Sequence, residues 1–172
     1  MSRINTPAVE TATGATAAVY AQIKKAAGKV PNTFAAIGAL APAALNAVLA
    51  AGSLSKQDQE TIKLLVSEIA GCDYCVAAHS LLGKMTGLKP DTLKRIRAGE
   101  STGDARRDAL TRFVRTLQET RGTISQEAYS AIKAAGYTDA QLVEIALAIV
   151  IVSFTNLFNR VNDTDVDFPR AA

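Results

Sequence analysis

The chain has 172 residues, a formal net charge of +3, 48% hydrophobic residues and only 5% aromatic residues. The length suits one domain, residues 1–172, that buries most of its apolar surface. The weak charge, with basic residues scattered and no aromatic residues among them, argues against a nucleic-acid-binding surface. Abundant alanine with few aromatics favours packed helices over a β-sandwich.

The residues before position 28 lack an apolar segment behind a basic start, so no secretory signal is expected. Apolar residues then recur with helical spacing along almost the whole chain, and the alternation typical of strands is absent. The predicted helices span 15–27, 33–40, 42–51, 55–70, 72–85, 90–98, 104–120, 125–135 and 138–159. The tail over 163–172 is polar and is expected to be extended.

Capping residues mark several helix starts. Asn32 is expected to cap the second helix from its N-terminal end. Ser55 with Asp58 resembles a capping box, and Thr138 with Gln141 matches one. These positions fix where the corresponding helices should begin.

Two helices stand out by their apolar pattern. In the helix over 55–70, Ile62, Leu65, Val66 and Ile69 are predicted to form one buried stripe. The last helix is apolar on all sides in its middle, so it is either central to the core or covered by another subunit. Its apolar run, 145–152, is bounded by polar residues and is too short to cross a bilayer. We therefore expect a cytoplasmic protein without a membrane partner.

Both cysteines and the only histidine, Cys72, Cys75 and His79, lie within eight positions. Gly71 is expected to end the preceding helix in a left-handed conformation, which places both thiols at the start of the next helix. Unpaired N–H groups and the helix dipole favour a thiolate there. His79 lies one turn after Cys75 and can take its proton. The pattern predicts a thiol redox site whose two sulfurs can meet in a disulfide.

The residues alone leave several alternatives open at this site. An orienting carboxylate for His79 could be Glu60 or Glu68, and helix geometry does not choose between them. Cys72, Cys75, His79 and a glutamate could hold zinc, although a structural zinc site normally uses two separated ligand pairs and no second pair exists. His79 could also be a buried histidine bonded to a backbone carbonyl, and the cysteines a permanent disulfide, which the lack of a secretory signal disfavours.

Glu60, followed after eleven residues by Cys72-x-x-Cys75-x-x-x-His79, resembles the signature of the alkylhydroperoxidase AhpD-like branch of the carboxymuconolactone decarboxylase family. Three further segments resemble the same family: 30–34, with the pattern Val-Pro-Asn-x-Phe, 135–141 before the last helix, and 154–159 at its Asn- and Phe-rich end. The resemblance covers most of the chain and places the domain core at about 28–160.

The resemblance implies an all-α fold, an AhpD-like helical bundle that assembles into homo-oligomers, trimers or hexamers, through its helices. It implies that Cys75 is the peroxidatic cysteine, oxidised to a sulfenic acid, and that Cys72 resolves it in a disulfide. Glu60, and not Glu68, matches the family's carboxylate and would form a proton relay with His79. The implied partners are a hydroperoxide substrate and a dithiol, thioredoxin-like or lipoyl reductant, with no metal or other cofactor.

One position departs from the family pattern. Tyr74 stands where better-studied peroxidases of this branch have a histidine between the cysteines, and it either lines the pocket or packs. The true decarboxylases of the wider family lack the thiol pair, so decarboxylation is not expected. We expect a thiol-dependent alkylhydroperoxidase, an antioxidant oxidoreductase. The alternative is a helical oligomer that senses oxidation or binds a partner with little turnover.

Overall fold

The computed structural model describes residues 6–42, 45 and 52–171, and these contain helices and no strand. The elements are η1 (Val9–Thr11), α1 (Gly14–Ala27), α2 (Asn32–Leu40), α4 (Lys56–Ile69), α5 (Asp73–Met85), α6 (Pro90–Ala98), α7 (Ala105–Thr120), α8 (Gln126–Ala134) and α9 (Asp139–Asn162). The predicted all-α fold is confirmed, and the described helices begin and end within three residues of their predicted bounds. The helix predicted over 42–51 lies mostly outside the described residues.

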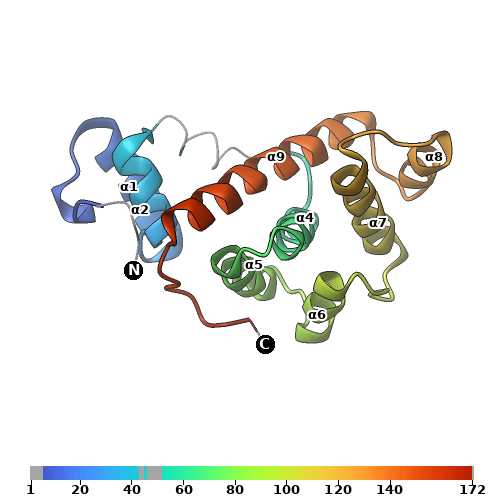
Figure 1. Cartoon of the computed structure of the whole chain (residues 1–172), viewed down its shortest axis with the longest axis horizontal. Coiled ribbons are helices and arrows are strands. Elements are labelled where there is room, and N and C mark those ends of the chain that lie inside the picture. Colours follow the sequence, from blue (N-terminus) through green and yellow to red (C-terminus); the bar gives the residue numbers. More distant parts are fainter. Residues whose placement is uncertain (1–5, 43–44, 46–51, 172) are drawn as a thin grey trace.

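Helix α4 occupies the centre of the molecule. It packs against α5, α6, α7 and α9, and the long α9 runs across one side of it (Figure 1). Helices α1 and α2 pair near the C-terminal end of α9, and α8 lies beyond its other end (Figure 1). The segment after α9 returns toward α5.

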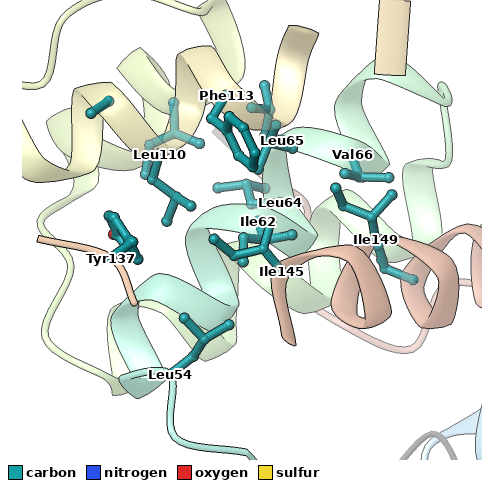
Figure 2. Close-up of a cluster of buried hydrophobic side chains, with 14 of the residues drawn as sticks. Leu54, Ile62, Leu64, Leu65, Val66, Leu110, Phe113, Tyr137, Ile145 and Ile149 are labelled. Atoms are coloured by element: carbon teal, nitrogen blue, oxygen red, sulfur yellow. The ribbon is translucent and has the colours of Figure 1, made fainter. Parts of the chain in front are cut away.

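The main hydrophobic core surrounds α4. Ile62, Leu65 and Val66 are almost fully buried, as predicted, and face side chains of α7 and α9 (Figure 2). The prediction is wrong for Ile69, which is 43% exposed at the last turn of α4, whereas Leu64 is completely buried. Because neighbouring helices cover α4 from several sides, its buried surface is wider than a single helical stripe.

A second apolar cluster joins α1 and α2. It contains Val19, Tyr20, Ile23 and Ile37, with Phe158 of α9 partly buried against them. This cluster fixes the pair of helices beside the last turns of α9. As a result, the first turn of α2 reaches the region between α5 and α9.

The predicted cap of α2 is wrong. Pro31 occupies the N-cap position without a side-chain cap bond, and Asn32 is already the first residue of the helix. The side chain of Asn32 donates instead to the backbone carbonyl of Asp165 at 3.2 Å. A tertiary contact with the C-terminal segment therefore takes the place of the local capping bond.

The two other predicted caps differ in detail. The capping box of Thr138 and Gln141 is complete at the start of α9, which confirms that prediction. Ser55 Oγ accepts from the backbone N–H of Asp58, but the Asp58 carboxylate does not form the reciprocal hydrogen bond with the backbone N–H of Ser55. It accepts instead from Tyr137 Oη at 3.0 Å and from Arg106 at 2.9 Å, and so ties α4 to α7 and to the start of α9.

Helix α9 extends beyond its predicted end at residue 159. It ends at Asn162, with Asp163 in the left-handed region at φ 51°. Its 24 residues are therefore long and apolar enough to cross a membrane by length and composition alone, unlike the shorter run considered in the sequence. One face of α9 packs on α4, and this face carries buried Asn156 and Asn159.

Gly71 shapes the turn that joins α4 to α5. Its φ of +62° confirms the predicted left-handed conformation. The Gly71 N–H bonds to the carbonyl of Glu68, and the Cys72 N–H bonds to that of Ser67. This pattern is a Schellman motif, which satisfies the last carbonyls of α4. Cys72 is thus both the residue that closes α4 and the N-cap of α5.

Candidate active site

Cys72 and Cys75 meet at the N-terminus of α5. The two residues are joined by a disulfide, with their Cα atoms 5.3 Å apart. Cys72 Sγ also accepts a hydrogen bond from the backbone N–H of Cys75 at 3.3 Å, as an N-cap side chain does. Both cysteines are buried, at 2% and 3% exposure. The sulfurs therefore lie in a dry, electropositive turn that suits thiolate chemistry.

Glu60 and His79 form a buried pair between α4 and α5. Glu60 Oε2 lies 2.8 Å from His79 Nδ1, and Lys63 Nζ donates to Glu60 Oε1 at 3.2 Å. Burial opposes ionisation of Glu60 and by itself would raise its pKa. His79 and Lys63 favour the ionised form through their charges and hydrogen bonds, and together they lower the pKa of Glu60. Glu60 therefore remains an anion that fixes the imidazole ring.

The second candidate carboxylate lies elsewhere. Glu68 accepts from Arg97 Nε at 2.6 Å, in a half-exposed ion pair between α4 and α6. Of the two glutamates that the sequence left open, only Glu60 contacts the histidine. Because Glu60 is bonded to Nδ1, Nε2 is the ring nitrogen that remains to exchange a proton with a thiol one turn away.

Two site residues were given no role from the sequence. Asn159 Nδ2 donates to Cys75 Sγ at 3.2 Å, and Thr33 Oγ1 donates to Asn159 Oδ1 at 2.7 Å. All three side chains are buried. Both residues fall in segments that carry the family resemblance, 30–34 and 154–159. The resemblance therefore pointed to the segments that contain both residues. Their roles could not be predicted from it, because they depend on contacts between helices that are remote in sequence.

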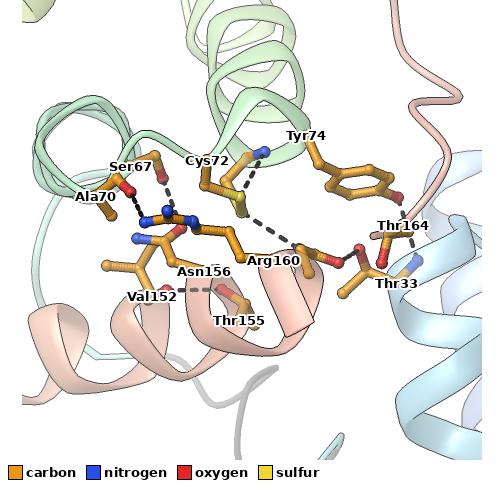
Figure 3. Close-up of a disulfide and its surroundings, with 12 residues drawn as sticks. Thr33, Ser67, Ala70, Cys72, Tyr74, Val152, Thr155, Asn156, Arg160 and Thr164 are labelled. Atoms are coloured by element: carbon orange, nitrogen blue, oxygen red, sulfur yellow. Dashed lines mark hydrogen bonds between the residues drawn. A yellow bond between two sulfur atoms is a disulfide. The ribbon is translucent and has the colours of Figure 1, made fainter. Parts of the chain in front are cut away.

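Tyr74 packs beside the disulfide and does not face solvent. Its hydroxyl accepts from the Thr33 N–H at 3.2 Å and donates to Asp167 Oδ1 at 2.9 Å. Figure 3 shows its ring extending from α5 toward Thr33. Burial raises the pKa of Tyr74, and the Asp167 carboxylate adds to this effect while the bond from Thr33 opposes it. Tyr74 is therefore neutral and acts as a packing and hydrogen-bonding residue.

Residues 163–171, which we call the C-terminal strap, lie across the site. The Phe168 ring packs edge-on to Tyr74, with centroids 5.4 Å apart, and joins the cluster formed by the two cysteines. Lys29 Nζ bonds to the side chain of Asp167 at 2.9 Å and lies 5.2 Å from the Phe168 ring centre. The strap thus covers the cysteines and links them to the start of α2.

Neither of two surface hollows in the described structure is lined by a cysteine. One is lined by residues around η1 and α1, and the other lies between α7 and α9. Since both sulfurs are buried, a substrate reaches them only when covering residues move. The strap carries Phe168, which packs against the cluster of the two cysteines and is only partly buried, and is the element best placed to do so.

The residues proposed for zinc do not gather as a ligand set. No group of three or more His, Cys, Asp or Glu side chains in the described part of the chain is arranged to hold a metal ion. The two sulfurs bond to each other, and His79 Nδ1 faces Glu60.

The described helices thus bring together a Cys-x-x-Cys pair at a helix start and a buried Glu–His pair beside it. Residues 31–113 match the carboxymuconolactone decarboxylase family. No curated protein matches the sequence.

Solved structures show the same fold. A peroxidase-related protein with the alkylhydroperoxidase AhpD core, from Ralstonia eutropha JMP134, has a TM-score of 0.85 at 20% identity, covering 96% of this chain and 92% of its own. A peroxidase-related protein from Silicibacter sp. TM1040 has a TM-score of 0.78 at 20% identity, with coverages of 95% and 91%. The debrominase Bmp8, as a variant in complex with 2,3,4-tribromopyrrole, has a TM-score of 0.76 at 18% identity, with coverages of 97% and 94%. The fold is therefore AhpD-like.

Proposed function

We propose that this protein is a thiol-dependent alkylhydroperoxidase, in which Cys75 attacks the peroxide and Cys72 resolves the product. The observation that carries the proposal is the pairing of two buried sulfurs at the start of α5 with the Glu60–His79 pair along the same helix. The match of residues 31–113 to the carboxymuconolactone decarboxylase family and the AhpD-like fold support it.

The cycle balances without a metal or an added cofactor. The Cys75 thiol gives its proton to His79, and the thiolate sulfur attacks the outer oxygen of ROOH. The O–O bond breaks, Cys75 becomes a sulfenic acid, and His79 returns the proton to RO⁻ to give ROH. The Cys72 sulfur then displaces hydroxide, which leaves as water, and a disulfide forms. A dithiol reductant restores both thiols and is itself oxidised to a disulfide.

Glu60 serves this cycle by orienting His79. A carboxylate bonded to Nδ1 fixes the ring and stabilises the imidazolium that forms when Nε2 takes a proton. The reductant belongs to the class of dithiols, either a thioredoxin-like protein or a lipoyl group. We place the cycle in the cytoplasm, where a Cys-x-x-Cys pair is returned to its reduced form.

A peroxide-consumption assay with a dithiol reductant tests the proposal. Wild-type protein should consume an alkyl hydroperoxide, and Cys75→Ser should abolish this consumption. Cys72→Ser should stop at the sulfenic acid after one equivalent of peroxide. Full activity in Cys75→Ser would refute the assignment of that residue. Since a debrominase shares the fold, 2,3,4-tribromopyrrole serves as the counter-substrate, and turnover of it without peroxide consumption would contradict the proposal.

The two glutamates of α4 provide a matched pair of variants. Glu60→Gln should lower kcat/KM by about 100-fold, the smaller end of the range for general acid–base catalysis. Glu68→Gln removes a carboxylate from the same helix that bonds Arg97 and not His79, and should leave kcat/KM unchanged. Equal loss in the two variants would exclude a relay through Glu60.

We also propose that the chain assembles with copies of itself through α9, as a trimer or hexamer. Six large apolar residues of α9 are 41–70% exposed: Val143, Leu147, Val150, Phe154, Leu157 and Val161. They recur at alternating spacings of four and three residues, the heptad spacing that packs helices side by side. Beside them lies a largely apolar hollow of about 650 Å³ between α7 and α9. Such a stripe is rarely left in water.

This stripe also favours the second candidate function. A helical oligomer whose assembly responds to oxidation of Cys72 and Cys75, with little peroxide turnover, would need the same apolar surface. Asn159 connects the two features, because it lies on α9 and contacts Cys75. A change of subunit number on oxidation, combined with negligible peroxide consumption, would favour this function over the peroxidase.

A further inference from the structure

Asn159 is a buried amide in direct contact with the sulfur of Cys75. Its Nδ2 atom donates to Cys75 Sγ at 3.2 Å, and the side chain is 4% exposed. The relay of Glu60 and His79 does not use this contact. An amide donor aimed at a reacting sulfur therefore has a role still to be assigned.

Thr33 fixes the orientation of this amide. The Thr33 hydroxyl donates to Asn159 Oδ1 at 2.7 Å, so the carbonyl end of the amide faces Thr33 and the NH₂ end faces the sulfur. The Thr33 backbone N–H donates in turn to Tyr74 Oη. The donor on α9 is thus held by α2, and α2 is held by the helix that carries the cysteines.

The two sulfurs have different hydrogen-bond donors. Cys72 Sγ accepts from a backbone N–H at the helix start, which alone would make Cys72 the more acidic thiol. Asn159 gives Cys75 a donor of its own. In a buried site, an N–H group binds an anionic sulfur more strongly than a neutral thiol. The amide therefore favours the thiolate at Cys75, the position from which the peroxide would be attacked.

We propose that Asn159 is a catalytic residue that stabilises the thiolate of Cys75, and that Thr33 positions it. This inference deepens the proposed peroxidase function and rests on it. Asn159 would hold the sulfur anionic before the peroxide arrives, after His79 has taken the proton. The donor would then make Cys75, and not Cys72, the attacking thiol of the pair.

Charged and titratable groups also lie on the elements that surround Cys75. They are Glu60 and Lys63 on α4, Asp73, Tyr74 and His79 on α5, Arg160 on α9 and Asp167 in the strap. Asn159 differs from all of these because its amide neither titrates nor carries a charge. Its removal deletes one hydrogen bond and leaves the net charge of the site unchanged, so its effect can be separated from theirs.

The test measures thiolate formation in Asn159→Leu and Thr33→Val, each combined with Cys72→Ser so that Cys75 is the only thiol. The ultraviolet absorbance of the thiolate is followed as the pH is raised. The midpoint of thiolate formation should rise by about one pH unit in Asn159→Leu, because the variant loses the hydrogen bond that stabilises the thiolate. It should rise by less in Thr33→Val, where the amide is kept but no longer oriented.

Asn156 provides the matched control. It is also a buried amide on the inner face of α9, one turn earlier, but it bonds Ser67 Oγ at 3.1 Å and not a cysteine (Figure 3). Asn156→Leu in the same background should leave the midpoint unchanged.

An unchanged midpoint in both test variants, or an equal rise in Asn156→Leu, would overturn the inference. If Asn159→Leu does not fold, the more conservative Thr33→Val decides. The measurement uses no peroxide, so it tests the role of Asn159 independently of the proposed peroxidase function. A shifted midpoint in a protein that consumes no hydroperoxide would overturn the proposed function and leave the thiolate donor in place.

Discussion

Glu60 is a buried carboxylate whose ionised form depends on two neighbours. His79 and Lys63 lower its pKa by more than burial raises it. At pH values above the ordinary carboxyl pKa, about 4.3, the group is ionised in both the folded and the unfolded chain. Below that value the unfolded chain takes up the proton first, so the contribution of Glu60 to stability is lost as the pH falls through the lowered pKa.

This linkage predicts the pH dependence of a stability difference. The free energy of unfolding of wild-type protein should exceed that of Glu60→Gln most at neutral pH. The difference should narrow as the pH falls below about 4. Denaturant unfolding of both proteins between about pH 3 and pH 7 measures it. A difference that is constant over this range would contradict a lowered pKa at Glu60.

The choice between Glu60 and Glu68 shows what sequence reasoning can and cannot predict about single residues. The clustering of Cys72, Cys75 and His79 is visible in the sequence, since helical spacing places them along one helix. The partner of His79 depends on how α4 packs against α5, and helix periodicity does not contain that angle. The family resemblance selected Glu60, and the contacts agree in placing Glu60 at His79 and Glu68 at Arg97.

At the scale of elements, helices were predicted well because each is specified locally. The glycine at 71 and the capping box at Thr138 end and start helices through bonds within a few residues. The errors lie where a distant segment competes with a local bond. Asn32 bonds the strap and does not cap α2, and Ile69 is exposed because neighbouring helices cover another part of α4.

The strap is the element whose role the sequence left unassigned. It was expected only to be polar and extended, yet Asp167 bonds Tyr74 and Phe168 packs against the cluster of the two cysteines. Its ion pair with Lys29 is partly exposed, and such pairs contribute about 0–1 kcal/mol. The packing of the partly buried Phe168 and the bonds from Tyr74 and Asn32 also hold the strap.

Phe168→Ala should expose the disulfide to large reductants. We expect a thioredoxin-like dithiol protein to reduce it several-fold faster than in wild type, with a smaller gain for a small phosphine. Val166→Ala is the matched control, because Val166 lies in the same strap with 45% of its surface exposed and should leave both rates unchanged. Thiol titration over time measures the rates. Equal rates in wild type and Phe168→Ala would mean that the strap does not limit access.

At the scale of the whole molecule, one large apolar surface of the described structure stays exposed and outside the hydrophobic core. The outer face of α9 carries large apolar residues along most of its length, while its inner face packs on α4 and reaches Cys75. The sequence predicted this helix to be either central or covered by another subunit. The burial pattern shows that, within the described part of the chain, only the inner face is covered.

Leu147→Glu should therefore weaken self-association. A charge in the middle of the exposed stripe would be buried without a partner on assembly, at a cost of several kcal/mol. Light scattering coupled to size-exclusion chromatography should show a lower mass than for wild type. Met85→Glu is the control, because Met85 is 73% exposed at the end of α5, away from the stripe. A wild-type protein that is monomeric at all concentrations would refute assembly through α9.

Tyr74 lies where its fluorescence can report on the state of the two cysteines. The protein contains four tyrosines and no tryptophan, so its intrinsic fluorescence comes from tyrosine alone. Tyr74 packs in one cluster with Cys72 and Cys75, and a nearby disulfide quenches a phenol's emission whereas separate thiols quench it less. Opening the sulfur–sulfur bond should brighten the molecule, so its oxidation state can be followed optically in real time without a dye.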